Sequence, residues 1–272
     1  MTARANYVCL PPSGMVIALG YWAGDLAQAM RLARLIGAIE TRRRDDVVFA
    51  FCPRFDVEWT AEQQAVFMEV GRKFGVCRVT QRPPHATGHP DAPNAMFAST
   101  LGQFAEAWRA GQSRAHSVFL CEPDGAPLRR DWIDVLKYEH DWTMRDHLSV
   151  TGPWVEHPVP HLNGSMIVHF STWFDCPSIR ETPEGHAWDL MHAHALWARG
   201  RATGALKNIY GAANWSDYAL TGMARETAWL TSTKDDSAIA WVERTLVAAR
   251  APELGTEEPT PASGPRRVRV NG

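Results

Sequence analysis

The stretch Ser117-Val118-Phe119-Leu120-Cys121-Glu122-Pro123-Asp124-Gly125 decides the fold that the sequence predicts. Its short apolar run, bounded by polar residues, is typical of a strand that is buried on both faces. Pro123 cannot donate to a strand ladder and keeps the residues before it extended, so we expect the strand to end there. Glu122 and Asp124 then share one side of an extended segment, because side chains alternate with a period of two.

Two carboxylates at the end of a buried strand mark a candidate site, because open α/β sheets bind ligands at the carboxyl ends of their strands. Carboxylate oxygens suit a hard divalent cation that is bound together with a phosphate. An acidic surface turn is the alternative for an isolated pair of this kind. The order of elements in the rest of the chain favours the binding site.

Strands and helices alternate over the first half of the chain. Apolar runs at residues 15–19, 47–52 and 76–79 predict three further strands, and helical periodicity is found at residues 25–44, 60–74 and 94–108. This alternation predicts an α/β fold with a Rossmann-type, mostly parallel central sheet, right-handed crossovers and flanking helices.

The pattern changes after residue 124. We expect a short helix at 131–136, strands at 148–152 and 165–168, and helices at 184–198 and 236–247. Residues 251–272 have no periodicity and are rich in Pro, Glu, Gly and Thr, so they are predicted to be a disordered tail.

Composition limits the class of protein. The 272 residues carry a net charge of −2, which argues against a wholly basic surface for nucleic acid. No apolar run approaches the length of a membrane helix, and the N-terminus has no signal-peptide pattern. The five scattered cysteines suit free thiols in a reducing compartment, so a cytoplasmic protein is expected.

The acidic stretch is followed some forty residues later by His161-Leu162-Asn163-Gly164-Ser165-Met166. With both motifs the chain resembles a GT-A-fold nucleotide-sugar glycosyltransferase. The resemblance implies a nucleotide-sugar-binding half at 1–124 and a smaller, mixed acceptor-binding and catalytic half at 125–250 of the same domain. It also implies metal-dependent transfer of a sugar, most readily from a UDP-sugar, to an acceptor hydroxyl.

The resemblance assigns roles to individual residues. Mn²⁺ or Mg²⁺ would bind Asp124. Glu122, which stands where the family usually has aspartate, would be a further ligand or would act through water or on the ribose. A histidine would complete the shell: His192, or else His186 or His194. Asp189 is the first choice for the catalytic base, ahead of Glu184 and Asp175, and would share one helix face with two histidines. The nucleotide-sugar-binding set comprises Leu19, Gly20, Tyr21, Arg54, Asp56, Asn94, Glu122, Asp124, Asn163 and Gly164.

Several alternatives stay open within that set. Tyr21 or Phe55 would stack on the base, or be ordinary loop aromatics. Asn94 would lie near the diphosphate, or only cap its helix. The turn at Asn163 and Gly164 would touch the transferred sugar, or be an ordinary hairpin turn.

The acceptor is the least constrained part of the prediction. Arginine clusters and many tryptophans are compatible with duplex DNA, as in bacteriophage enzymes that glycosylate 5-hydroxymethyl pyrimidines; such an enzyme would work in the host cytoplasm. Alternatives are a cell-surface glycan or small-molecule acceptor, a nucleotidyltransferase, and a non-catalytic protein that binds sugar or nucleic acid. The oligomeric state is left open. The clusters comprise Arg42, Arg43, Arg44, Arg129, Arg130, Arg199 and Arg201.

Overall fold

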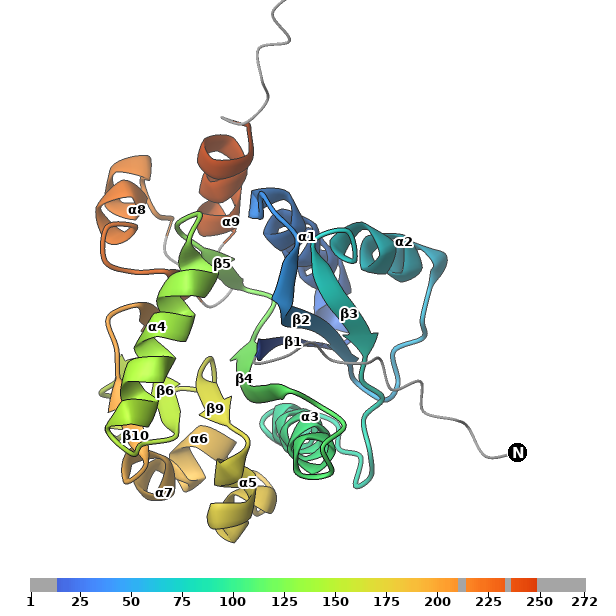
Figure 1. Cartoon of the computed structure of the whole chain (residues 1–272), viewed down its shortest axis with the longest axis vertical. Helices are drawn as coiled ribbons and strands as arrows, with labels where there is room; N and C mark the ends of the chain where they lie inside the picture. Colours follow the sequence, from blue (N-terminus) through green and yellow to red (C-terminus); the bar gives the residue numbers. More distant parts are fainter. Residues whose placement is uncertain (1–13, 210–213, 233–235, 249–272) are drawn as a thin grey trace, which may run out of the picture.

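The computed structural model describes residues 14–209, 214–232 and 236–248 (Figure 1). A seven-stranded sheet with the order β10-β6-β9-β4-β1-β2-β3 runs through the molecule. Four of its strands come from the first half of the chain and pair in parallel, as the sequence predicts. They are β1 (Gly14–Tyr21), β2 (Arg44–Pro53), β3 (Phe74–Arg78) and β4 (Ala115–Cys121).

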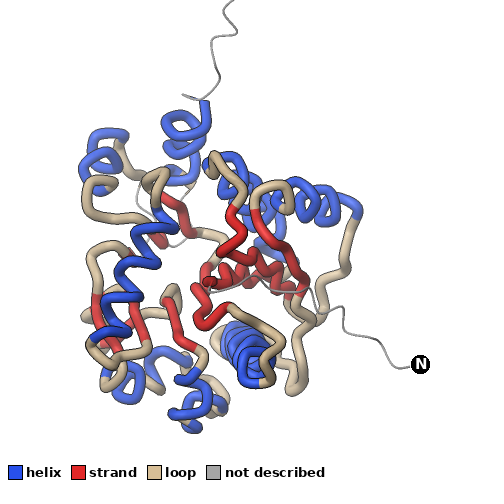
Figure 2. The backbone as a smooth tube through the Cα atoms, viewed as in Figure 1, coloured by secondary structure: helices blue, strands red, loops and turns tan. Residues whose placement is uncertain are grey.

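Helices cover both faces of these parallel strands (Figures 1 and 2). α1 (Leu26–Ile39) and α2 (Ala61–Val70) pack on one face, and α3 (Asp91–Arg109) packs on the other. β1 is buried along its whole length, so its alternating side chains enter two separate cores. Leu19 and Tyr21 lie in the core under α1 and α2, whereas Val16 and Ala18 lie in the core under α3.

The second half of the chain completes the sheet with mixed pairing. β9 (Ile167–His169) is antiparallel to β4 and to β6 (Val150–Gly152), and β10 (Gly200–Ala202) is parallel to β6. α4 (Trp132–Arg145) is longer than predicted. A second sheet joins β5 (Gly125–Pro127), β11 (Leu206–Ile209) and β12 (Trp229–Ser232), and β7 (Trp154–Val155) pairs with β8 (His161–Leu162). The fold is therefore the predicted α/β architecture with a smaller mixed region.

The predicted helix over 184–198 is wrong. The segment instead forms two short helices, α6 (Trp188–Met191) and α7 (Ala193–Trp197), after an irregular stretch. Gly185 takes a positive φ of 77°, which no helix allows, and Pro183 precedes it. The remaining helices are η1 (Ala23–Asp25), α5 (Ser171–Asp175), η2 (Pro177–Arg180), α8 (Asp217–Met223), α9 (Ser237–Val242) and the π-helical turn η3 (Glu243–Val247).

The predicted tail at 251–272 lies outside the described residues. None of the helices in the described part of the chain is long and apolar enough to cross a bilayer.

Candidate functional site

The acidic pair lies where the sequence predicts it, at the carboxyl end of β4, but the backbone there is not extended. The amide of Gly125 donates to the carbonyl oxygen of Glu122 at 3.1 Å, which closes a turn over residues 122–125. Pro123 suits such a turn because its ring fixes φ. The two carboxylates remain close enough for the charge of Asp124 to raise the pKa of Glu122.

A third carboxylate, Asp25, belongs to this cluster and was missed by the sequence prediction, which placed it only at the start of a helix. β1 and β4 are neighbours in the sheet, so the residues that follow them lie side by side. Asp25 accepts a hydrogen bond from the amide of Trp22 at 2.7 Å. Burial raises the pKa of Asp25 to about 6, and the charge of Asp124 adds to this effect.

Asp189 is held in a fixed orientation by the turn that follows β8. Its Oδ2 accepts hydrogen bonds from Asn163 Nδ2 and from the amide of Gly164, both at 3.2 Å. Its Oδ1 accepts from the amide of Leu190 at 2.9 Å. The side chain is 17% exposed, so it is ordered by the protein and can still reach a ligand.

His161 lies behind Asp189 and was part of the quoted motif without a role. Its side chain is fully buried, and its Nδ1 donates to the carbonyl oxygen of Val159 at 2.7 Å. Its other ring nitrogen, Nε2, lies 3.8 Å from Asp189 Oδ2. In the sequence, the only signal for this contact is that the polar residue His161 lies close to Asn163.

Glu122 interacts with Asp124 and Asp25 on one side and with Asp189 on the other. Burial raises its pKa to about 8, with further increases from the charges of Asp124 and Asp189. A Cβ added to Gly164 would lie 3.9 Å from Glu122 Oε1 and 3.9 Å from Asp189 Oδ2. The structure thus brings together five predicted site residues, with a glycine leaving open the space beside both carboxylates. They are Glu122, Asp124, Asn163, Gly164 and Asp189.

A buried chain of hydrogen bonds leads from the second sheet to Glu122. Trp229 Nε1 donates to Thr231 Oγ1 at 3.1 Å, and Thr231 Oγ1 donates to Ser165 Oγ at 3.1 Å. Ser165 in turn hydrogen-bonds Glu122 and lowers its pKa against the larger effect of burial. The chain fixes the carboxyl group from a strand more than a hundred residues away in the sequence.

The predicted metal-ligand set is not assembled. Among the described residues, no three His, Cys, Asp or Glu side chains are arranged to hold a metal ion. His192, expected to join Glu122 and Asp124, has its Nε2 3.2 Å from Thr182 Oγ1 and its ring edge-on to Trp188. His192 therefore does not complete a group of three ligands with the two carboxylates.

Known proteins resemble this chain in structure but not in sequence. No protein-family model matches the chain, and no curated protein matches it. Solved structures do match. The bifunctional glycosyltransferase WbbM matches with a TM-score of 0.54 at 9% identity. The match covers 85% of this chain and 50% of the WbbM chain, so this chain spans about half the length of WbbM. An active-site mutant of LgtC has a TM-score of 0.53 at 11% identity, covering 86% of this chain and 96% of that one. The galactosyltransferase LgtC in complex with donor and acceptor sugar analogues has a TM-score of 0.52 at the same identity and coverage.

The chain has the GT-A fold.

Within this GT-A fold, three of the predicted nucleotide-binding residues are buried in β1. Leu19, Gly20 and Tyr21 are buried, and Tyr21 accepts a hydrogen bond from Gln63 Nε2 at 3.1 Å. Burial raises the pKa of the Tyr21 hydroxyl. Tyr21 therefore cannot stack on a base, because its ring faces the core under α1 and α2; only the backbone of this segment borders the site.

The exposed aromatic residue at this edge of the GT-A fold is Trp22, which sequence reasoning passed over. Its side chain is 49% exposed, and the guanidinium of Arg54 lies 5.3 Å from its ring centroid. Arg54 also makes two hydrogen bonds of 2.6 Å to Asp56, and this contact lowers the pKa of the Asp56 carboxyl. The second candidate for stacking, Phe55, already stacks on His85 with centroids 4.3 Å apart.

Asn94 has a structural role, and the capping role is wrong. α3 begins three residues earlier, so Asn94 does not cap it. Its Nδ2 donates to the carbonyl oxygen of His186 at 2.7 Å, and its Oδ1 accepts from the amide of Trp188 at 2.9 Å. Asn94 thereby anchors the segment that carries Asp189.

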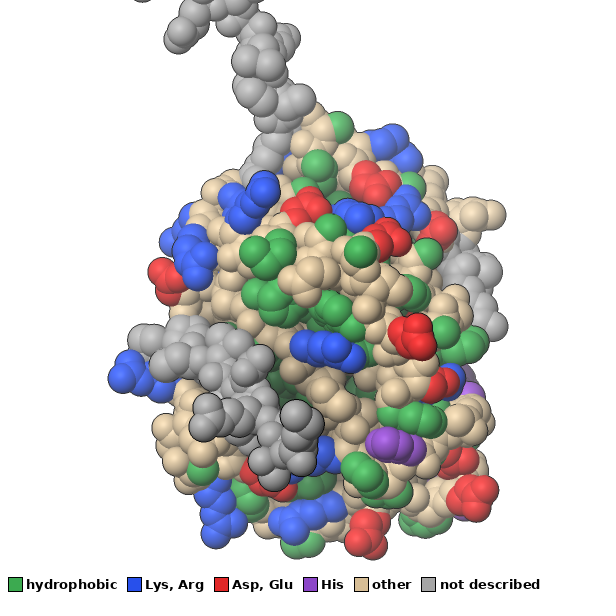
Figure 3. All heavy atoms as spheres, turned by 90° about the vertical axis from the view of Figure 1, so that its right-hand side faces the viewer, with side chains coloured by type: hydrophobic (Ala, Val, Ile, Leu, Met, Phe, Trp, Pro, Cys, Tyr) green, Lys and Arg blue, Asp and Glu red, His purple; other side chains and the backbone are tan. Residues whose placement is uncertain are grey.

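The arginine clusters are largely engaged with carboxylates. Six of the seven predicted cluster residues lie within ion-pair distance of an acidic side chain, and Figure 3 shows Lys, Arg, Asp and Glu interspersed over one face. Cations paired in this way attract phosphate less strongly. The pairs are Arg42 with Asp134, Arg43 with Asp45, Arg44 with Asp134, Arg129 with Asp131, Arg199 with Asp175 and Arg201 with Asp146.

Proposed function

We propose that this protein is a glycosyltransferase that transfers a sugar from a nucleotide sugar to an acceptor hydroxyl. One observation carries the proposal: Glu122 and Asp189 meet beside Gly164 at the carboxyl end of β4 in a GT-A fold, with Asp124 next to Glu122. A UDP-sugar is the proposed donor. Asp56 can accept from the imide of uracil, and Trp22 offers an exposed ring for stacking.

Mn²⁺ or Mg²⁺ is the proposed cofactor, and the donor set fits it. Glu122 and Asp124 supply hard oxygen ligands, and the charged neighbours that act on Glu122 (Asp124, Asp189 and Asp25) are all negative. Two carboxylates suffice, since such ions complete their shells with water and substrate phosphates. The ion would neutralise the charge that develops on the departing diphosphate.

Asp189 is the proposed general base. Its Oδ2 would take the proton of the acceptor hydroxyl while the hydroxyl oxygen bonds to the anomeric carbon. The electron pair of the breaking anomeric C–O bond leaves with the diphosphate. The two donors from Asn163 and Gly164 keep the carboxylate aimed during this step. Replacing Asp189 with Asn should lower kcat by about 10²–10⁴-fold and leave donor binding intact.

The acceptor is proposed to be a glycan or a small molecule. The sequence also suggested 5-hydroxymethyl pyrimidine in phage DNA, but six of the seven cluster arginines pair with carboxylates. A DNA acceptor is therefore the weaker proposal.

Thermal shift against UDP-, GDP-, TDP- and CMP-sugars, each with and without Mn²⁺, tests the proposal. A ligand that binds only the native state raises its stability by about 2.7 kcal/mol at a hundred times Kd. We expect a metal-dependent rise with one donor, which Asp124→Ala abolishes and Asp141→Ala, at an exposed carboxylate, retains. The absence of any rise in the wild type would overturn the transferase assignment.

A further inference from the structure

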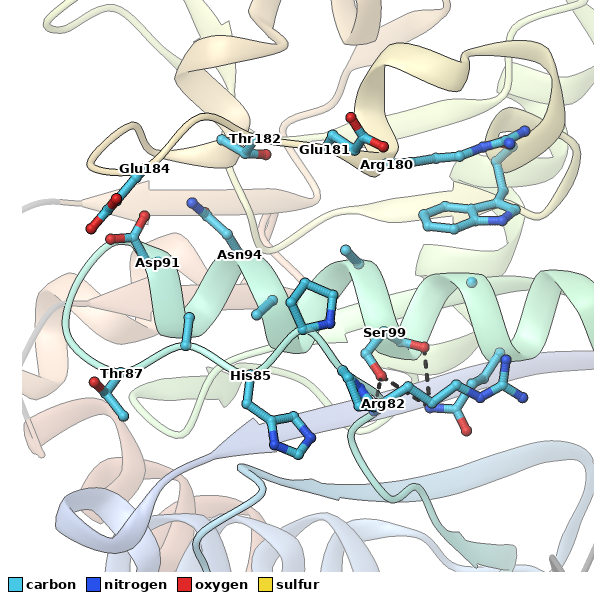
Figure 4. Close-up of a pocket in the computed structure, with 18 of the residues that line it drawn as sticks. Arg82, His85, Thr87, Asp91, Asn94, Ser99, Arg180, Glu181, Thr182 and Glu184 are labelled. Atoms are coloured by element: carbon cyan, nitrogen blue, oxygen red, sulfur yellow. Dashed lines mark hydrogen bonds between the residues drawn. The ribbon is translucent and has the colours of Figure 1, made fainter.

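A cavity of about 890 Å³ lies on the solvent-facing side of α3, away from the acidic cluster (Figure 4). Its floor is made of small residues of α3: Ala95, Ala98 and Gly102. Its walls are the loop at 82–87 and the segment at 180–184. We call this cavity the α3 groove. It runs along the helix from Asp91 to Glu106, and a rise of 1.5 Å per residue makes it roughly 20 Å long.

The lining of the α3 groove combines polar side chains with apolar ones, among them Pro83, Pro84 and Trp173. Figure 4 shows the hydroxyls of Thr87, Ser99 and Thr182 and the carboxylate of Glu181 around the groove. Trp173 contributes an aromatic ring, which lies close to the floor because Gly102 has no Cβ: an added Cβ would lie 2.7 Å from Trp173 Cζ2. Hydroxyl, carboxylate and guanidinium groups beside an aromatic ring match the hydroxyls and apolar faces of a sugar.

The charges around the groove select against a polyanion. Two cations, Arg82 and Arg180, face four carboxylates, which gives a net charge of 2 − 4 = −2. Arg82 is also paired with Glu106 at 2.6 Å. The net negative lining disfavours a phosphate-rich chain, whereas it does not oppose a neutral polyol. The carboxylates are Asp91, Glu106, Glu181 and Glu184.

The groove and the proposed catalytic base share one wall. Asp91 Oδ1 accepts from the amide of Gly185 at 2.8 Å, and Asn94 binds the backbone of His186 and Trp188. Both anchoring residues line the groove, and the segment that they hold leads directly into Asp189. A chain lying in the groove would therefore end beside the segment that carries the base.

We propose that the α3 groove binds a neutral oligosaccharide and that this oligosaccharide is the extension of the acceptor. The proposed binding is argued from the groove alone. The role of the oligosaccharide as an extension of the acceptor rests on the proposed function. The groove is an elongated, net-negative cavity that combines polar side chains with one aromatic ring, and it takes several sugar units rather than one.

The test is a binding measurement that does not depend on transfer. Maltohexaose, cellohexaose and N-acetylchitohexaose are titrated into the full chain by ligand-observed NMR, with a single-stranded oligothymidylate as the polyanion. We expect saturable binding of one neutral hexasaccharide and at least a tenfold loss of affinity in Ala98→Trp, which fills the floor. Ala110→Trp, at an exposed position past the end of α3, is the matched control and should bind as the wild type does.

Two further variants distinguish a loss of sugar binding from misfolding and from a failure of the transferase proposal. Ala95→Trp replaces Ala98→Trp if circular dichroism shows that the first variant is unfolded. Asp124→Ala should retain hexasaccharide binding, so a failure of the transferase proposal leaves this result standing. Binding of none of the three sugars, binding that survives both floor substitutions, or displacement of the sugar by the oligothymidylate would each overturn the proposal.

The acceptor role has its own measurement. With a donor identified by thermal shift, Ala98→Trp should raise KM for the hexasaccharide at least tenfold and leave KM for the corresponding monosaccharide unchanged. Equal effects on the two acceptors would show that the groove does not hold the acceptor chain.

Discussion

The substitution Glu122→Gln should stabilise the protein in a pH-dependent way. The pKa of Glu122 is raised to about 8 in the folded protein from its ordinary value of 4.5, because of its burial and the charges of Asp124 and Asp189. The folded state therefore holds a proton that the unfolded state releases between these two values. Stability falls as pH rises through this window, and the penalty is fully developed only above about pH 8. Glutamine keeps the size of the side chain and its hydrogen bond to Ser165 but has no proton to release.

The size of the effect follows from the two pKa values. Between about pH 5 and pH 8 the cost of ionising Glu122 grows by roughly 3 kcal/mol. For a chain of this size such a difference shifts Tm by on the order of 10 °C. Asp25, whose pKa is raised to about 6, is present in both proteins and contributes in the same direction.

Thermal unfolding of the two proteins, followed by circular dichroism without divalent ions, measures this difference. We expect Glu122→Gln to exceed the wild type at about pH 8 by far more than at about pH 5. Glu58→Gln, at an exposed position, is the control and should follow the wild type at both pH values. A constant difference between Glu122→Gln and the wild type across this range would refute the reasoning about the buried carboxyl.

Three further substitutions test the site. Gly164→Ala places a Cβ at ordinary contact distances, 3.5 Å from Phe97 and 3.9 Å from both carboxylates, so Tm should change little while transfer activity falls at least tenfold. A parallel loss of Tm would indicate a structural role instead. Trp22→Ala should weaken donor binding by about 1–3 kcal/mol in calorimetry if the exposed ring stacks on the base, and unchanged affinity would exclude stacking. Thr231→Val removes the middle of the hydrogen-bond chain and should cost about 1–3 kcal/mol in denaturant unfolding, because Trp229 Nε1 loses its acceptor; an unchanged midpoint would contradict this.

Much of the first half of the fold could be predicted from the sequence. Buried strands and amphipathic helices carry local periodicities, and the acidic pair could be placed at the end of β4 because an apolar run stops at Pro123. The turn at Asn163 and Gly164 and the acid at 189 were likewise identified. The sequence does not show which face of the sheet each β1 side chain lies on, because a strand buried on both faces has no alternation of polar and apolar residues. Tyr21 could therefore be taken for a ring that faces the ligand.

The sequence by itself determined the elements, the parallel order of the first four strands and the candidate acids Glu122, Asp124 and Asp189. Only the tertiary structure decided which acids meet. Asp25 joins the cluster because β1 and β4 are adjacent in the sheet, and Asp189 reaches Glu122 because the turn after β8 holds it there. His192 is left out because its ring contacts Thr182 and Trp188 instead. The physical reason is that periodicity reports the burial of one segment, whereas a site depends on how distant segments pack together.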